Sequence, residues 1–175
     1  MRVFRHGSPR HRPEVHEADR LDWSVVGCLN LGVDRAELAG GAHWLYFPDA
    51  DVPFYRVGFP TNFSDGVAPP GTGSMYVEFG LRGDESPHPA ALEARAIEAL
   101  RREGLLEARD RVLAREFVRI DPGYVVFDRA RQDVMTRVVP ELLRHDVHLI
   151  GRYGAWTYSY MERALLDGLE VAARL

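Results

Sequence analysis

The residues with the strongest chemical character lie near the C-terminus, in the segment 151–162, which reads GRYGAWTYSYME. A glycine turn that leads into a helix exposes unpaired backbone N–H groups at the positive end of the helix dipole. Such a turn favours a carboxylate, a phosphate or an electron-rich carbonyl. Arg152 adds a permanently charged, planar donor beside it. The segment is therefore a candidate anion site, the alternative being a glycine turn with a purely structural role.

The same segment resembles the C-terminal flavin motif of the UDP-galactopyranose mutases and related FAD-dependent enzymes of the amine oxidase superfamily, in which Gly-Arg-x-Gly-x-aromatic-x-Tyr-x-x-Met precedes a helix. The resemblance implies that Arg152 approaches the flavin or its pyrophosphate, that the backbone near Met161 faces the flavin pyrimidine edge, and that Tyr158 lines the substrate side. Tyr160 stands where the family usually has Asp. The implied cofactor-binding residues are Gly151, Arg152, Gly154, Trp156 and Met161.

Arg56 stands in a second segment of this resemblance. Residues 52–56, VPFYR, resemble the family's Val-Pro-aromatic-x-Arg strand, whose arginine binds the substrate pyrophosphate in the mutases. An arginine among apolar strand neighbours needs an anionic partner, because burying an unpaired charge is costly. That partner is either a ligand or an internal carboxylate such as Glu78 on a neighbouring strand.

A third segment, 124–128 (YVVFD), resembles the family's tyrosine-bearing strand before the penultimate helix. It implies that Tyr124 contacts the substrate, the alternative being a core or edge aromatic residue. The segments 44–48 (WLYFP) and 60–64 (PTNFS) resemble bacterial members of the amine oxidase or protoporphyrinogen oxidase type. The predicted catalytic residues are Tyr158 and Tyr124, and the predicted substrate-binding residues are Arg56, Tyr55, Asn62 and Tyr46.

Such flavoenzymes hold the FAD pyrophosphate with a strand, a G-x-G-x-x-G turn and a helix. This sequence has no such motif, because its GTG at 71–73 lies in a Pro-rich loop and precedes a strand-like run. We expect the substrate-binding and flavin-capping portion of the fold without its N-terminal Rossmann half, with FAD as the candidate cofactor. The favoured function is a truncated or split FAD-dependent oxidoreductase or mutase-like protein. The alternatives are a cofactor-independent isomerase, cyclase or lyase that reuses the pocket, and a non-catalytic binding module.

Composition and charge narrow the partners and the location. The formal net charge of -4 is spread over mixed-sign stretches without a basic stripe, so no nucleic-acid partner is expected. No apolar run approaches the roughly 20 residues that span a bilayer, and the single cysteine, Cys28, is compatible with a reducing cytoplasm. The chain contains no lysine, which excludes Schiff-base chemistry through lysine. The expected partners are a small anionic substrate such as a nucleotide-sugar, and either a Rossmann-containing chain or a second copy.

No metal site is expected. His6, His11 and His16 recur every five residues, a spacing that places them on no common face of a helix or strand.

The elements that must position these residues follow from periodicity. Runs of β-branched and aromatic residues separated by Gly, Pro, Asp and Asn predict strands at 23–31, 43–47, 54–59 and 74–81. Two further strands, 116–120 and 124–127, are separated by an Asp-Pro-Gly turn signal, and a short buried strand is expected at 147–150. Amphipathic helices are predicted over 89–106, 129–144 and 161–175. The last helix is expected to turn Leu165, Leu169 and Ala172 inward.

The pattern predicts an α+β fold, a mixed, mostly antiparallel sheet with about three helices in a single domain. Residues 1–20 are rich in Arg, His and Pro, so we expect an irregular N-terminal arm. Residues 21–175 are expected to form one substrate-domain-like unit that ends in the strand, glycine turn and helix of the flavin-cap motif.

Overall fold

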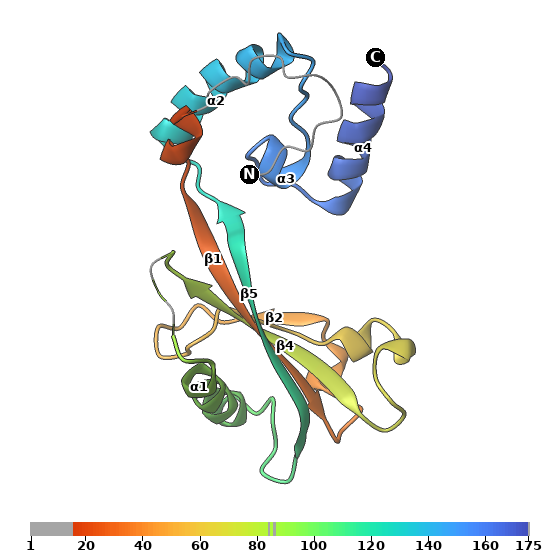
Figure 1. The fold of residues 1–175 in the computed structure, drawn as a ribbon. Helices are drawn as coiled ribbons and strands as arrows, with labels where there is room; N and C mark the ends of the chain where they lie inside the picture. Colours follow the sequence, from red (N-terminus) through yellow and green to blue (C-terminus); the bar gives the residue numbers. More distant parts are fainter. Residues whose placement is uncertain (1–15, 84, 86, 175) are drawn as a thin grey trace. The chain divides into compact units, whose positions relative to one another are not determined.

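The computed structural model describes residues 16–83, 85 and 87–174, which form two compact units (Figure 1). The first unit, Trp23–Tyr124, contains the sheet and one long helix. The second combines the two ends of the chain, 16–22 and 125–174 among the described residues, and is mainly helical. Most of the expected arm lies outside the described residues, and so do His6, His11 and the side chain of His16. The described end of that arm, His16–Arg20, is a 3-10 helix, η1.

Five strands form a sheet in the order β2-β3-β4-β1-β5. β2 pairs with β3, β3 with β4 and β4 with β1, each in the antiparallel sense. The α+β class with a mostly antiparallel sheet is therefore confirmed, and the first four predicted strands are present with shifted ends. The strands are β1 (Trp23–Val33), β2 (Trp44–Tyr46), β3 (Arg56–Gly58), β4 (Gly73–Leu81) and β5 (Val112–Val125).

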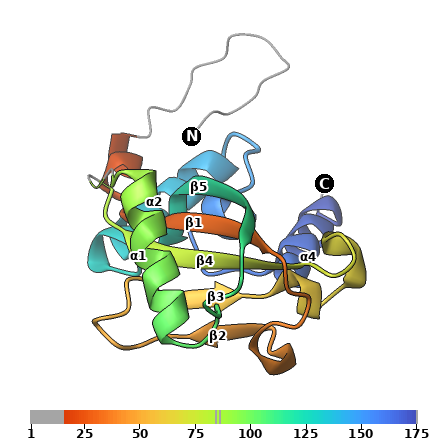
Figure 2. The ribbon, with the colours of Figure 1, turned by 90° about the horizontal axis from the view of Figure 1, so that it is seen from below.

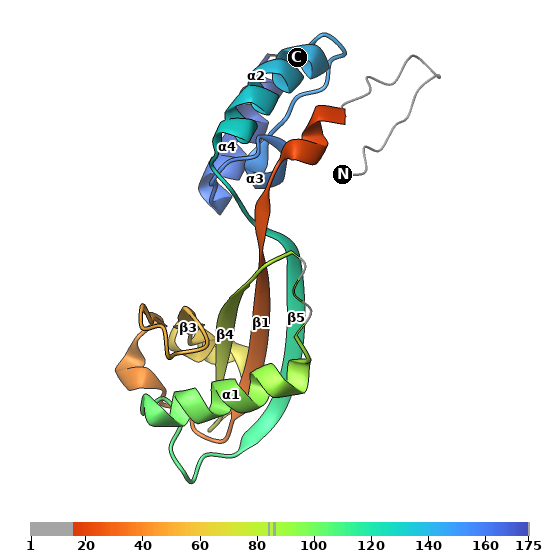
Figure 3. The same ribbon diagram turned by 90° about the vertical axis from the view of Figure 1, so that its left-hand side faces the viewer.

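One face of the sheet is buried against α1 (Pro89–Arg102), which lies across it (Figures 2 and 3). Met75, Val77 and Phe79, alternate residues of β4, are at most 1% exposed. They pack in one core with Leu92 and Ala96 of α1. Because side chains alternate across a strand, the residues between these positions point to the opposite face of the sheet.

β5 runs without a break through residues 121–123, so the predicted Asp-Pro-Gly turn is wrong. Asp121 accepts a hydrogen bond from the Trp23 indole at 2.7 Å instead of initiating a turn. The backbone of Gly123 lies so close to β1 that a Cβ there would stand 3.0 Å from the carbonyl oxygen of Ser24. Pairing with β1 therefore overrides the local turn signal.

The second unit contains α2 (Arg129–Leu143), α3 (Gly151–Gly154) and α4 (Met161–Ala172). α2 begins where predicted, because the Asp128 carboxylate caps it by accepting from the Arg131 N–H at 2.7 Å. The strand predicted at 147–150 is wrong. Ile150 is extended (φ −131°, ψ 161°), but no strand in the described part of the chain pairs with this segment. None of the described helices is long and apolar enough to cross a membrane.

An ion pair links the segment after β1 to the segment before β5 at one end of the sheet unit. The Arg35 guanidinium approaches Asp110 Oδ2 through Nε at 3.0 Å and through Nη2 at 2.8 Å. Asp110 is 7% exposed and also accepts from the Glu107 N–H at 2.8 Å. Burial alone raises the pKa of Asp110, but the hydrogen bonds from Arg35 and Glu107 outweigh it and hold the pKa below its usual value.

The Asp110→Asn variant is expected to lower the free energy of unfolding by about 2 kcal/mol, the scale of a hydrogen bond to a charged group. Because the pKa of Asp110 is lowered by folding, this stabilisation is present above the unfolded pKa and is lost as pH falls through the folded value. Urea denaturation should therefore show a smaller difference from wild type at about pH 3 than at neutral pH. The control is Asp34→Asn, which removes a pair with the exposed Arg111. Equal losses in the two variants would contradict the role assigned to Asp110.

Candidate functional site

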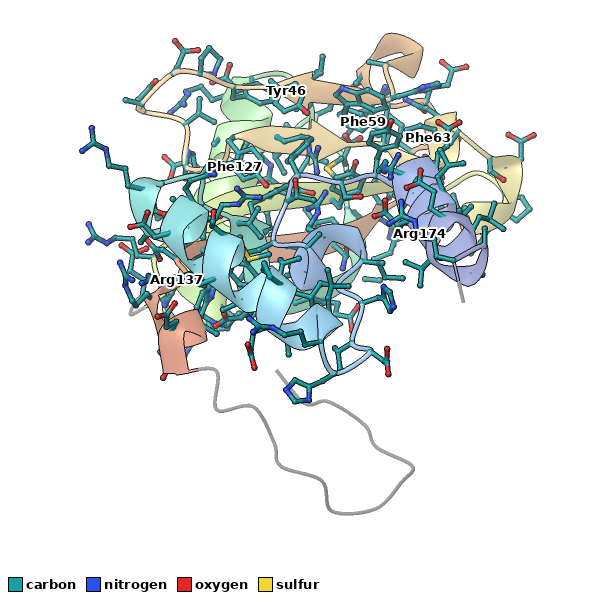
Figure 4. The ribbon with its side chains drawn as sticks, turned by 90° about the horizontal axis from the view of Figure 1, so that it is seen from above. Tyr46, Phe59, Phe63, Phe127, Arg137 and Arg174 are labelled. Atoms are coloured by element: carbon teal, nitrogen blue, oxygen red, sulfur yellow. The ribbon has the colours of Figure 1, made fainter. Side chains whose placement is uncertain are left out.

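The face of the sheet opposite α1 carries polar side chains in a row across four strands. The register places Tyr46 opposite Arg56, Arg56 opposite Glu78, and Glu78 opposite Cys28. We call Tyr46, Arg56, Glu78 and Cys28 the polar row. Its members alternate along their strands with buried apolar residues such as Val77, which keeps them on one face. Tyr46 lies on the outermost strand, β2 (Figure 4).

The Arg56 guanidinium is the centre of the polar row. Its Nη2 donates to Glu78 Oε1 at 2.6 Å, and its Nη1 donates to the Tyr46 hydroxyl oxygen at 3.3 Å. Glu78 is 8% exposed, and its Oε2 accepts from the Tyr55 hydroxyl at 2.5 Å. Burial lowers the pKa of Arg56, but the hydrogen bonds to Glu78 and Tyr46 outweigh it and raise the pKa above its usual value. The internal salt bridge considered from the sequence is therefore present.

Two other ionisable groups near Glu78 are held in their neutral forms. Burial, and then the hydrogen bond to Glu78, raises the pKa of Tyr55, so this phenol remains a donor. Burial, and then the charge of Glu78, raises the pKa of the Cys28 thiol to about 11. A thiol that is protonated at neutral pH is a poor nucleophile. Cys28 is therefore a strand residue of this face rather than an activated cysteine.

Four of the sequence-predicted site residues meet in this region. Tyr46 bonds Arg56, and Tyr55 bonds the carboxylate that pairs with Arg56. Tyr124, from β5, lies close enough to interact electrostatically with both Tyr55 and Arg56. The structure thus brings together residues from β2, β3 and β5 that are up to 78 positions apart in the sequence.

Asn62, also predicted to bind substrate, has a different environment. Its Nδ2 donates to the carbonyl oxygens of Leu38 at 3.0 Å and Ala42 at 2.6 Å. Both amide hydrogens are therefore used within the fold, where they tie the segment after β3 to the segment before β2. A substrate contact would fall to its Oδ1, and that role stays a prediction.

Sequence reasoning missed an aromatic cluster at the β2 edge of the sheet. The rings of His43 and Phe63 stack with centroids 4.2 Å apart, and the Trp44 and Phe63 centroids are 6.0 Å apart. Trp44 and Phe63 are 49% and 53% exposed. Trp44 and Phe63 belong to the segments 44–48 and 60–64, which resemble the family. The aromatic residues in these two segments were the sequence signal that could have indicated the cluster.

Sequence reasoning also missed Tyr76, whose ring covers Gly58 on the same face of the sheet as the polar row. Gly58 pairs with Tyr76 between β3 and β4, and a Cβ at Gly58 would overlap the Tyr76 ring. The Arg56 Cζ lies 6.0 Å from the centroid of that ring. A glycine two residues after an arginine in a strand was the signal, since glycine within a strand often marks a close approach.

In the second unit, the flavin-cap segment 151–162 folds back on itself. The Gly151 N–H (φ 68°) donates to Asp167 Oδ2 at 3.1 Å, and this hydrogen bond lowers the pKa of Asp167. Arg152 Nη2 donates to the Ser159 carbonyl at 2.7 Å, and its Cζ lies 5.3 Å from the centroid of the Tyr158 ring. A carboxylate of the chain itself therefore occupies the anion position predicted at this turn.

The remaining cofactor-binding candidates lie in or beside the same segment. Gly154 ends α3, and Met161 begins α4 and is 87% exposed. Trp156 is 9% exposed, and its carbonyl oxygen accepts from Arg131 Nε at 2.6 Å. Five of the predicted residues thus lie within one short segment: Gly151, Arg152, Gly154, Trp156 and Tyr158. Their contacts with a cofactor stay predictions.

An apolar stripe runs along α4, at positions four residues apart. None of the described residues of α4 is buried, so the expectation that its apolar residues face inward is wrong. Arg163 bonds Asp167 at 2.7 Å, and Asp167 bonds the Gly151 turn, which ties the polar side of the helix to that turn. Ala172 is exposed as well. The stripe consists of Met161, Leu165 and Leu169, which are 87%, 71% and 67% exposed.

No family model matches this sequence. A solved structure of reduced UDP-galactopyranose mutase matches 81% of the chain with a TM-score of 0.75 and 28% sequence identity. This chain is similar to part of a UDP-galactopyranose mutase. The match covers 30% of the mutase chain, so this chain spans less than a third of that protein's length. The resemblance stated from the three sequence segments is confirmed.

The similarity to UDP-galactopyranose mutase is not confined to the sheet. The sheet unit, Trp23–Tyr124, holds 102 of the 175 residues, so a match over 81% of the chain must extend into the second unit. The mutase likeness therefore covers residues from both the polar-row unit and the unit that contains the flavin-cap segment.

The Gly58→Ala variant is expected to lower the free energy of unfolding by about 1–3 kcal/mol, because the added methyl group displaces the Tyr76 ring. The matched control is Gly80→Ala on β4, where an added Cβ meets nothing within 4 Å. Chemical denaturation of both variants, of Tyr76→Ala, and of Gly58→Ala combined with Tyr76→Ala measures the coupling between the two positions. Similar stabilities for Gly58→Ala and Gly80→Ala would contradict the overlap assigned to the Tyr76 ring.

Proposed function

We propose that this chain provides the substrate-binding wall and the flavin cap of an FAD-dependent oxidoreductase or mutase. The observation that carries the proposal is the polar row, in which Arg56 is held between a buried carboxylate and an exposed tyrosine hydroxyl. An arginine beside an exposed tyrosine hydroxyl suits a phosphate or diphosphate group. The similarity to a UDP-galactopyranose mutase supports a nucleotide-sugar as the substrate class.

The roles of individual residues follow from this placement. Arg56 and Tyr46 bind the anionic group, and Tyr124 contacts the substrate from β5. The Tyr124 phenol is the proposed hydrogen-bond or proton donor of the sheet unit, and the Tyr158 phenol is the proposed donor of the second unit. A cytoplasmic location remains part of the proposal.

The flavin cap is proposed to be the segment 151–162. Arg152 supplies a cation beside the ring of Tyr158, which is 68% exposed, and Met161 adds exposed apolar surface. These groups fit a cofactor that combines a planar ring with phosphates. The Gly151 N–H is not part of the cap, because Asp167 accepts its hydrogen bond. A bound FAD supplies electron-transfer chemistry, and the chain's own residues bind and orient it.

The dinucleotide-binding function is proposed to come from a Rossmann-containing partner chain that covers the stripe on α4. The sequence given has no G-x-G-x-x-G motif, and the match leaves most of the mutase chain without a counterpart here. Exposed apolar stripes of this kind mark interaction surfaces. The same stripe supports a second candidate function, a non-catalytic module that pairs with another copy of itself.

The chain together with its Rossmann-containing partner is expected to bind FAD saturably, and Arg152→Ala is expected to weaken binding about tenfold, the effect of losing one charged hydrogen bond. Visible absorbance and quenching of flavin fluorescence measure the titration. The control is Arg137→Ala, which removes the same charge from α2, where Arg137 pairs with Glu17 at 2.9 Å (Figure 4). Equal weakening would deny Arg152 a specific role. Failure of the wild-type chain to bind FAD even with its partner present would favour a cofactor-free function.

The Leu165→Glu variant is expected to lose the partner chain, because a charge in the stripe cannot be buried without compensation. The tagged chain, isolated from its source cells, should form a one-to-one complex with a flavin-containing protein that has a G-x-G-x-x-G motif. Light scattering gives the mass, and peptide sequencing identifies the partner. Glu162→Gln, which removes a charge from the same helix outside the stripe, is the control. A wild-type chain found alone, or paired only with itself, would overturn the assignment.

A further inference from the structure

We infer that Glu78 and Tyr55 are positioning residues, which hold Arg56 so that one guanidinium nitrogen, together with the Tyr46 hydroxyl, forms a two-point site for a phosphate group. The inference rests on the proposed function in one respect, that the polar row faces the substrate. It differs from the sequence-based prediction for Tyr55, which placed this residue in direct contact with the substrate.

The nitrogen atoms of the Arg56 guanidinium differ in their access to a ligand. Nη2 is committed to Glu78 at 2.6 Å, in a part-buried hydrogen bond. Nε is buried and has no hydrogen-bond partner among the described residues. Nη1 makes the exposed hydrogen bond to the Tyr46 oxygen. The bidentate fork that arginine usually presents to a phosphate is therefore occupied on the Nη2 side, and Nη1 is the nitrogen next to the exposed Tyr46 hydroxyl.

The Tyr46 hydroxyl is a second donor beside Nη1. Its oxygen accepts from Arg56 at 3.3 Å, so its own proton is directed away from Arg56. Tyr46 is 60% exposed, and within the described part of the chain no acceptor bonds this proton. A hydroxyl that accepts from a cation becomes a stronger donor. Nη1 and the Tyr46 O–H are thus adjacent donors on the exposed side of the row.

Glu78 holds this arrangement in place. Glu78 is 8% exposed and uses both oxygens, Oε1 for Arg56 and Oε2 for the Tyr55 hydroxyl. A carboxylate bonded at both oxygens cannot rotate without breaking a charged hydrogen bond. Arg56 and Glu78 are also direct cross-strand partners, so the sheet register fixes the distance between their backbones. The hydroxyl of Tyr55 therefore acts on a ligand only through Glu78 and Arg56.

The charge of Glu78 and its positioning of Arg56 have opposite effects on anion binding. Glu78 carries a negative charge next to the arginine that would bind an anion. If charge alone mattered, removing Glu78 would make the site more cationic and would tighten anion binding. If Glu78 positions Arg56, removing its hydrogen bonds releases the guanidinium and weakens binding. The two roles therefore predict opposite signs for the same substitution.

The experiment is calorimetric titration of the full chain with UDP, the probe that carries the diphosphate. Glu78→Ala and Glu78→Gln both remove the charge, but glutamine can still accept from Arg56 and donate to the Tyr55 oxygen. Glu78→Ala should weaken UDP binding at least about tenfold, while Glu78→Gln should stay within about threefold of wild type. Equal tightening in both variants would overturn the positioning role.

Tyr55→Phe tests the same inference without any change of charge. It removes one hydroxyl and keeps both charged residues, Glu78 and Arg56. The overall fold should therefore persist, and far-UV circular dichroism and thermal melting check this. UDP binding should weaken about three- to tenfold. Unchanged affinity in this variant would overturn the inference even if Glu78→Ala fails to fold.

The outcomes also distinguish this inference from the proposed function. If the wild-type chain does not bind UDP, the polar row is not a phosphate site and both fail. If UDP binding depends on Glu78 and Tyr55 while FAD is not bound, the positioning role stands and the flavin cap fails. If UDP binds and none of the variants alters its affinity, the substrate face stands and the positioning role fails.

Discussion

The ion pair between Arg56 and Glu78 is the interaction on which the candidate site depends. Two charges that are largely removed from water stabilise each other only when their geometry is close and their remaining groups are bonded. Here Glu78 meets both conditions, since its two oxygens accept from Arg56 and Tyr55. Removing either partner would leave a poorly hydrated charge within the sheet. The orientation of Arg56 is therefore set by the fold before any ligand arrives.

The register of the sheet supplies that geometry, and the core behind it supplies the register. Side chains alternate with a period of two, so a slip of one residue in β4 would turn Glu78 toward α1 and Val77 toward the polar row. The buried apolar residues of β4 and α1 oppose such a slip. The helix on one face of the sheet thus determines which charged groups meet on the other.

The parts of the structure that could be predicted are those that a local sequence pattern is enough to define. β1 to β4 and α2 follow from alternation, helical periodicity and the Asp128 cap. The Asp-Pro-Gly turn and the strand at 147–150 were predicted from local composition, yet pairing decides both. β5 continues through the turn signal because β1 lies beside it, and 147–150 has no pairing strand among the described residues. Likewise, the register that joins Tyr46, Arg56 and Glu78 required the three-dimensional pairing of the strands.

The flavin-cap segment shows why a motif can be recognised from sequence while its surroundings are not. Its polar groups are bonded within the chain, since Asp167 accepts from Gly151 and Arg152 donates to Ser159. Such a loop is held in shape without a ligand, which reduces the entropy lost on binding. Its apolar groups are different, because amphipathicity marks the apolar side of α4 but not what covers it. A segment with its polar contacts made internally and its apolar stripe exposed needs from a partner mainly apolar surface rather than hydrogen bonds.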